Sequence, residues 1–156
     1  MGKRIVLQLM TFLFAAGVFG LAMQAAGTSV TETTRDFTVT LKVLPPESFS
    51  GPKAEMVHDG GAKPLFLKGK HPPNHHLVVF VKKDGKPVEK AKVQIKYRPA
   101  DDAKAAWVEV PVVKMHVAGK GASTTHFGNN VNIPYGFYEV DIVINGGPPA
   151  VFKLTI

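Results

Sequence analysis

Apolar and polar residues alternate with a period of two along most of this chain, and that pattern limits the fold more than any other feature. Successive side chains of a β-strand point to opposite faces, so an alternating segment predicts a half-buried strand. The alternating segments are residues 37–43, 93–98, 137–144 and 151–156. The residues predicted to face inward in the last three are Val93, Ile95, Tyr97, Tyr138, Val140, Ile142, Ile144, Phe152, Leu154 and Ile156.

Three further stretches are interpreted as strands on other grounds. Residues 76–81 are apolar after the first position, as in a central buried strand, and residues 107–117 are strand-like, with Pro111 indicating an edge or a bulge. Residues 47–74 are rich in proline and glycine and are expected to be loop, with short strands at 54–58 and 65–67. Six or seven strands and no helix after the leader predict an all-β fold, an immunoglobulin-like antiparallel two-sheet sandwich.

The first 27 residues have the pattern of an export signal. Lys3 and Arg4 precede a mostly apolar stretch over residues 5–23, and small residues follow at 25–27. We expect cleavage near Gly27 and a periplasmic or secreted protein, and an uncleaved membrane anchor is the alternative. Removal of 27 of the 156 residues leaves 129, which fits a single β-sandwich domain over residues 28–156.

Charge and cysteine content exclude several classes of function. The chain has a formal net charge of +7 and no cysteine. It therefore cannot form disulfides, carry a thiolate-ligated blue-copper centre or be acylated as a lipoprotein. The lysines alternate with apolar residues instead of forming a stripe with aromatics, so no nucleic-acid binding is expected. The positive charge favours solubility, with some attraction to an anionic membrane surface or an acidic partner.

The histidines and methionines carry the only pattern that suggests chemistry. All six histidines lie between His58 and His126, and the two methionines beyond the leader, Met56 and Met115, lie in the same stretch. Imidazole together with thioether is a ligand set typical of copper, whereas imidazole alone also suits zinc or nickel.

Strand alternation separates the adjacent candidates. His75 and His76 should point to opposite faces, and so should Met115 and His116, so only one of each pair can serve one site. His126 precedes Phe127-Gly128-Asn129-Asn130 and follows a glycine-rich stretch over residues 118–125, so we expect its ring at the rim of a flexible loop.

Together these residues resemble a known family. The run from Met115 through the His126-Phe127-Gly128-Asn129-Asn130 loop to residues 135–140 is similar to periplasmic metal-binding proteins that accompany high-affinity iron permeases. His76-Leu77 resembles the pair that opens a strand in their first half, so the resemblance covers about residues 75–145. It implies an immunoglobulin-like sandwich, usually a homodimer, that binds a copper ion and takes part in iron acquisition, with an inner-membrane permease or another envelope protein as partner.

Carried over by position, the resemblance implies His76, Met115 and His126 as metal ligands. Two family ligands are missing, because Val78 stands where the family has a carboxylate and residues 145–149 replace an insertion that carries a histidine. A fourth ligand would come from His116, from His75 or His71, from a partner subunit or from solvent. Residues 77–93, with the turn Asp84-Gly85-Lys86-Pro87, also resemble the small YtkA-like exported domains.

Two hypotheses follow from the sequence. The first is an exported transition-metal binding protein for copper, which would favour Cu(I) because no carboxylate is predicted beside the imidazoles and the thioether. The alternative is an immunoglobulin-like binding or structural module of the cell envelope that holds no metal. We do not expect an enzyme, since the sequence has no nucleophile elbow, no His-Glu-x-x-His motif and no convincing acid pair.

Overall fold

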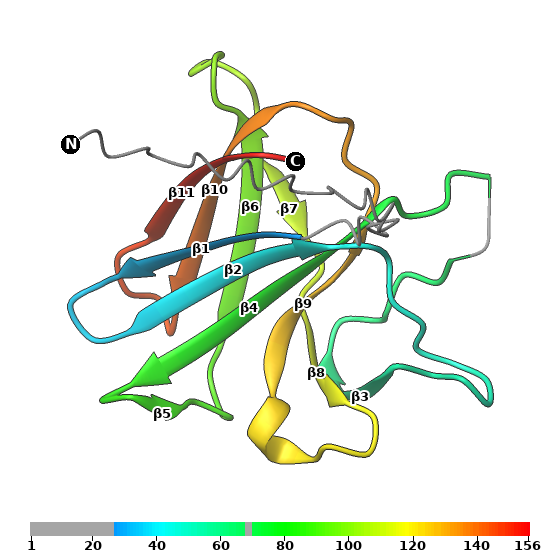
Figure 1. Cartoon of the computed structure of the whole chain (residues 1–156). Helices are drawn as coiled ribbons and strands as arrows, with labels where there is room; N and C mark the ends of the chain where they lie inside the picture. The colour runs from blue at the N-terminus through cyan, green and yellow to red at the C-terminus, as the bar shows by residue number, and fades with distance from the viewer. Residues whose placement is uncertain (1–26, 68–69) are drawn as a thin grey trace, which may run out of the picture.

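Two antiparallel β-sheets pack face to face as a sandwich, so the predicted all-β fold class is confirmed. The computed structural model describes residues 27–67 and 70–156 (Figure 1). The predicted signal segment falls almost wholly outside the described residues. Within those ranges, no helix is both long enough and apolar enough to cross a bilayer.

The larger sheet contains seven strands and the smaller sheet four. The order in the larger sheet is β1 (Thr28–Thr33), β2 (Thr38–Leu44), β4 (His75–Lys83), β9 (His126–Val131), β8 (Val113–Val117) and β3 (Met56–Gly61), with β5 (Lys86–Pro87) paired to β4. The order in the smaller sheet is β11 (Ala150–Thr155), β10 (Phe137–Ile144), β6 (Val93–Pro99) and β7 (Val108–Val110). One short 3-10 turn, η1 (Ala122–Thr124), precedes β9.

The main hydrophobic core lies between the two sheets. In β6, β10 and β11 it contains the side chains that alternation predicts to face inward, and all of these are buried except Tyr97, which packs against the core partly exposed. The larger sheet contributes the following residues from β2, β4 and β9: Val39, Leu41, Val43, Leu77, Val79, Val81, Phe127 and Val131.

Three segments differ from the sequence-based expectation. β1 was not predicted, and residues 65–67 form no strand. The expected strand over residues 107–117 is two strands, because the chain leaves the smaller sheet after β7 and joins the larger sheet at β8. Pro111 lies at this crossing, where its missing N–H costs no ladder hydrogen bond.

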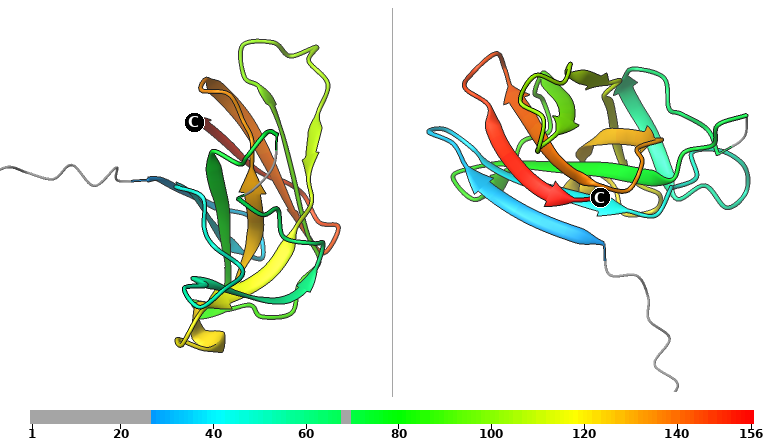
Figure 2. Two further views of the ribbon diagram at one scale, coloured as in Figure 1. Left: turned by 90° about the vertical axis from the view of Figure 1, so that its right-hand side faces the viewer. Right: turned by 90° about the horizontal axis from the view of Figure 1, so that it is seen from above.

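A second buried cluster lies on the outer face of the larger sheet, away from the sandwich core. It contains Met56, Val113 and Met115, with Phe49, Ala62 and Val117 packed against it. Phe49 belongs to the connection between β2 and β3, and Ala62 follows β3 directly. Both connections project from the same end of the molecule, which faces the viewer in the left-hand view of Figure 2.

Candidate metal centre

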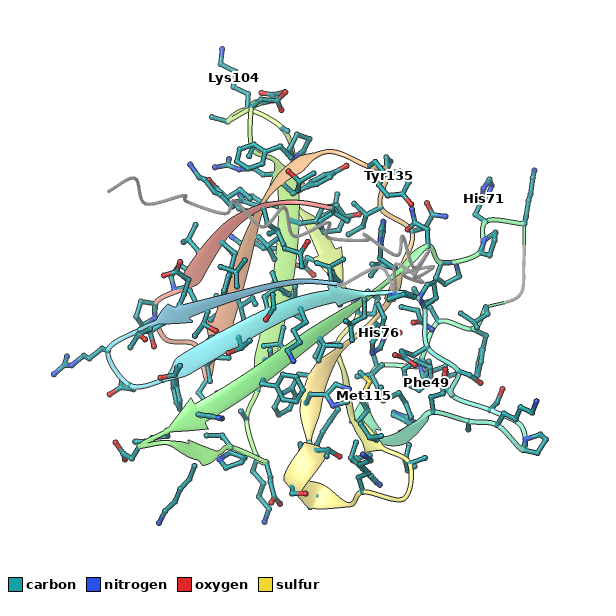
Figure 3. The ribbon with its side chains drawn as sticks, in the orientation of Figure 1. Phe49, His71, His76, Lys104, Met115 and Tyr135 are labelled. Atoms are coloured by element: carbon teal, nitrogen blue, oxygen red, sulfur yellow. The ribbon has the colours of Figure 1, made fainter. Side chains whose placement is uncertain are left out.

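Strand register places His76, His126 and Met115 on one face of the larger sheet. Met115 of β8 pairs with His126 of β9, and His76 of β4 pairs with Asn130 of β9. Directly paired residues of an antiparallel sheet share a face, and so do residues two apart on a strand. His126 and Asn130 are four apart, so all three candidates lie on the outer face. Figure 3 shows His76 and Met115 in this region together with Phe49.

His126 is not at the rim of a loop, and that expectation was wrong. Its side chain is 1% exposed, and it opens β9, which pairs with β4 on one side and β8 on the other. The preceding residues form the 3-10 turn η1, in which Thr124 Oγ1 accepts a hydrogen bond from the Val117 N–H. This turn joins β8 to β9 closely enough for His126 to enter the sheet.

The two imidazoles approach each other across Gly128. Their ring centroids are 6.3 Å apart and the ring planes are perpendicular. Gly128 lies between His126 and Asn130 on the strand and has a φ of 152°, and a Cβ at that position would collide with the carbonyl oxygen of Leu77. Glycine therefore permits this backbone and leaves no side chain between the two rings.

The hydrogen bonds of each ring determine its tautomer. His76 Nδ1 lies 2.9 Å from Asn130 Oδ1, and His126 Nδ1 lies 2.8 Å from the carbonyl oxygen of Thr124. The Asn130 amide nitrogen donates to two backbone carbonyls, which identifies its other atom as the oxygen. Both Nδ1 atoms must therefore be protonated donors. In a neutral imidazole this leaves a free lone pair on Nε2.

Neither Nε2 atom has a hydrogen-bond partner, although both are buried. A buried acceptor without a donor costs about 1–3 kcal/mol. Nε2 bound to an ion at about 2.1 Å places the ring centroid about 3.2 Å from that ion, so a centroid separation of 6.3 Å allows one shared ion only when that ion lies almost on the line between the two rings. The donor atoms present therefore fit a cation that accepts imidazole nitrogen.

Two thioethers lie on the same face of the larger sheet as the imidazoles. Met115 is fully buried next to His126, and Met56 is 7% exposed in the same cluster. Met56 of β3 pairs with Val117 of β8. Val117 is two residues from Met115 on β8, so Met56 shares the outer face with Met115. Sequence reasoning noted Met56 but did not propose it as a ligand, because its position depends on the pairing of β3 with β8.

Burial keeps both imidazoles neutral over most of the pH range. Loss of hydration lowers the pKa of His76 from 6.5 to about 4, and the hydrogen bond from its ring to Asn130 offsets this only in part. Burial also lowers the pKa of His126. A metal binds the neutral form of imidazole, so both rings are ready to act as ligands at neutral pH.

Asn130 connects His76 to two covering segments, residues 45–55 between β2 and β3 and residues 62–67 after β3. Its Oδ1 accepts from the Glu47 N–H at 3.0 Å as well as from His76, and its Nδ2 donates to the carbonyls of Glu47 and Leu65, each at 2.8 Å. Phe49 then lies edge-on to His76, with ring centroids 5.8 Å apart. One buried amide thus orients a candidate ligand and holds both covering segments.

A carboxylate pair lies close to His76, contrary to the expectation from the sequence. Burial and the neighbouring Glu55 raise the pKa of Glu47 to about 7. The pKa of Glu55 is lowered, mainly because its carboxylate accepts a hydrogen bond from the Ser48 N–H, and its charge also reaches His76. These side chains come from the segment between β2 and β3 and not from position 78, so local sequence gave no signal for them.

His116 and His75 point to the opposite face of the larger sheet. His116 Nδ1 bonds Asp59 Oδ2 at 2.7 Å, on the side of β8 opposite Met115. His75 points to the other side of β4 from His76 and lies 5.4 Å, between ring centroids, from Tyr135. His58 of β3 pairs with Met115 and therefore lies on the outer face, but its side chain is exposed, and His71 is exposed as well. Among residues 27–67 and 70–156, no group of three or more His, Asp, Glu or Cys could hold a metal, so a site on this face would need further ligands from thioether sulfur, a partner subunit or solvent.

Comparison of the chain with protein-family models, with curated proteins and with solved structures finds no match. The resemblance to the metal-binding proteins of iron permeases therefore remains a prediction from short motifs.

Proposed function

We propose that this protein is an exported copper-binding protein that holds Cu(I) through Nε2 of His76, Nε2 of His126 and the sulfur of Met115. The observation that carries the proposal is the pair of buried Nε2 atoms, both with a free lone pair and neither with a donor. Cu(I) is a soft cation that accepts imidazole and thioether ligands. Met56 is a candidate for the fourth ligand because it lies in the same buried cluster as Met115.

The surroundings favour the reduced over the oxidised ion. Phe49 and Phe80 lie against the two imidazoles, with centroids 5.8 Å from His76 and 5.4 Å from His126. Cu(II) prefers a square arrangement of nitrogen and oxygen donors, which this apolar face does not offer. The Glu47–Glu55 pair is the nearby source of oxygen, and the pKa of Glu47, raised to about 7, leaves this carboxyl about half protonated at that pH. A link to metal or iron uptake rests on the resemblance alone.

Competition titration with a chromophoric Cu(I) chelator tests the proposal. The wild-type chain should take up one Cu(I) per molecule, and saturation at 100 times Kd should stabilise the fold by about 2.7 kcal/mol. Met115→Leu keeps the apolar volume and removes the sulfur, and His126→Asn keeps a donor for the Thr124 carbonyl and removes Nε2. Each should weaken binding by more than about ten-fold, the lower limit seen when residues around a metal are replaced.

His116→Asn is the matched control, since His116 lies outside the cluster and has its own partner in Asp59. It should bind Cu(I) as wild type does. Equal binding by wild type, Met115→Leu and His126→Asn would refute the proposed ligands. Absence of any copper-dependent rise in melting temperature would favour the metal-free envelope module instead.

A further inference from the structure

Three consecutive apolar side chains project into solvent at the end of the molecule that carries the covering segments. Leu65 is 42% exposed, Phe66 is 54% exposed and Leu67 is 43% exposed. A run of three exposed apolar residues is unfavourable in a soluble domain unless it contacts something. The question is therefore what covers these side chains.

The backbone under these side chains is fixed by two buried asparagines. The Leu65 N–H donates to Asn129 Oδ1 at 2.9 Å, and the Leu65 carbonyl accepts from Asn130 Nδ2 at 2.8 Å. Asn129 Nδ2 also donates to the Lys63 carbonyl at 3.1 Å. Pro64 is buried between them. The start of the apolar run is therefore anchored to β9, and its side chains are held outward.

Exposed lysines surround the apolar run. Lys63 and Lys70 lie on either side of it in the chain, and Lys53 lies in the other segment that projects from the same end (Figure 2). The described residues from 60 to 74 contain no carboxylate. The exposed carboxylates that closely precede this stretch in the chain are Glu55, which accepts the Ser48 N–H, and Asp59, which bonds His116 Nδ1. Positive charge therefore dominates around the run, in a chain whose net charge is +7.

We propose that residues 63–67, together with Lys53 and Lys70, dock this protein on the surface of an anionic lipid bilayer. Leucine and phenylalanine side chains enter the boundary between headgroups and acyl chains, while lysines beside them bind anionic headgroups. Symmetric pairing of two copies through this surface would bring like charges together, which disfavours self-association. The proposal is independent of copper binding, since none of these side chains is a proposed ligand.

The test places one fluorescent reporter in the loop and one elsewhere. Trp107 is the single tryptophan, so Trp107→Phe gives a dark background to which Phe66→Trp or Val151→Trp is added. Val151 is a matched control because it is 43% exposed and lies on β11 of the other sheet. The full-length chain is mixed with vesicles of phosphatidylcholine and phosphatidylglycerol that carry brominated acyl chains. Any contact with the vesicles through residues outside the loop is the same in both variants, so a difference between the two reporters comes from the loop.

Emission of Phe66→Trp should shift to shorter wavelength and be quenched by the brominated lipid, whereas Val151→Trp should remain unchanged. Replacing Lys53, Lys63 and Lys70 by glutamine should weaken this loop contact by about five-fold per lysine, or roughly 100-fold together. Quenching should also fall at high salt and in vesicles of phosphatidylcholine alone.

Several results would overturn the proposal. Equal quenching of the two reporters would show that the loop makes no special contact with lipid. A concentration-dependent shift of Phe66→Trp emission without vesicles would identify a second copy as the occupant. Shielding by soluble envelope proteins but not by vesicles would identify a protein partner. Loss of the loop contact in Met115→Leu, which removes a proposed copper ligand, would contradict the independence of the two proposals, whereas a contact that persists in this variant would support lipid docking whether or not copper binds.

Discussion

The depressed pKa of His76 makes the stability of this protein depend on acid in a way that one substitution can isolate. The pKa is about 4 in the folded protein and 6.5 as the ordinary value. The unfolded chain therefore takes up a proton on His76 below pH 6.5, whereas the folded protein does so only near pH 4. Stability from this group is fully present above pH 6.5 and is lost as the pH falls toward 4.

The expected loss follows from the two pKa values. One pKa unit corresponds to about 1.4 kcal/mol, so His76 alone should lower the free energy of unfolding by about 1.4 kcal/mol at pH 5.5 and about 3 kcal/mol at pH 4. His76→Asn removes this titration. Its amide nitrogen lies about where Nδ1 lies in histidine, so it can still donate to Asn130 Oδ1. The smaller side chain costs some packing, but by the same amount at every pH.

Urea denaturation of metal-free wild type and His76→Asn, measured from pH 7.5 to pH 4, provides the assay. The difference in free energy of unfolding between the two proteins should change by about 3 kcal/mol across this range, in favour of the variant as the pH falls. His126 and Glu47 titrate in both proteins and largely cancel. Parallel curves would refute the reasoning, because they would mean that His76 has the same pKa in the folded and unfolded chain.

Three further substitutions test other contacts around the site. Gly128→Ala should lower the free energy of unfolding, measured in urea, by more than about 3 kcal/mol, because the φ of Gly128 is positive and a Cβ there would meet a backbone carbonyl. Gly119→Ala is the control: its φ is also positive but the space around it is open, so it should cost only about 1–2 kcal/mol. Equal costs would contradict the close approach of β4 to Gly128. Asn130→Ala should speed amide hydrogen exchange at Glu47, whose N–H it releases, and unchanged exchange would mean that Asn130 does not hold this segment. Glu47→Gln should gain stability relative to wild type as the pH rises from 5 to 8. The pKa of Glu47 is raised in the folded protein, so wild type loses stability as the pH rises through about 7, whereas glutamine does not ionise. A difference in urea midpoint that stays constant with pH would show that Glu47 ionises normally.

Sequence periodicity was sufficient to predict that adjacent candidate ligands would point to opposite faces of a strand. His75 and His76 point to opposite sides of β4, and Met115 and His116 to opposite sides of β8, as alternation requires. Alternation is a local property of an extended chain, so it can be read without knowing which strands are neighbours. The two-sheet architecture follows from the same pattern, since each apolar face must be covered.

The surroundings of the candidate site depend on contacts between residues far apart in the sequence. Asn130 bonds His76 from 54 positions away and Glu47 from 83 positions away. The carboxylates near His76 and the second thioether, Met56, arrive through the connection between β2 and β3 and through the pairing of β3 with β8. No periodicity in one segment specifies these pairings, because they are fixed by the register of the assembled sheet.

The local interactions around the two imidazoles all leave the Nε2 atoms of His76 and His126 buried without a hydrogen-bond donor, and packing alone does not explain this arrangement. Asn130 and the Thr124 carbonyl engage both Nδ1 atoms, Gly128 leaves the space between the rings open, and Phe49 and Phe80 lie against the rings. Together they leave two buried lone pairs without donors, at a cost of about 2–6 kcal/mol. A domain is stable by only about 5–15 kcal/mol, so an apolar pair at these positions would fold better. Departures of this kind from local consistency occur at functional sites, and the proposed Cu(I) ion would satisfy both lone pairs at once.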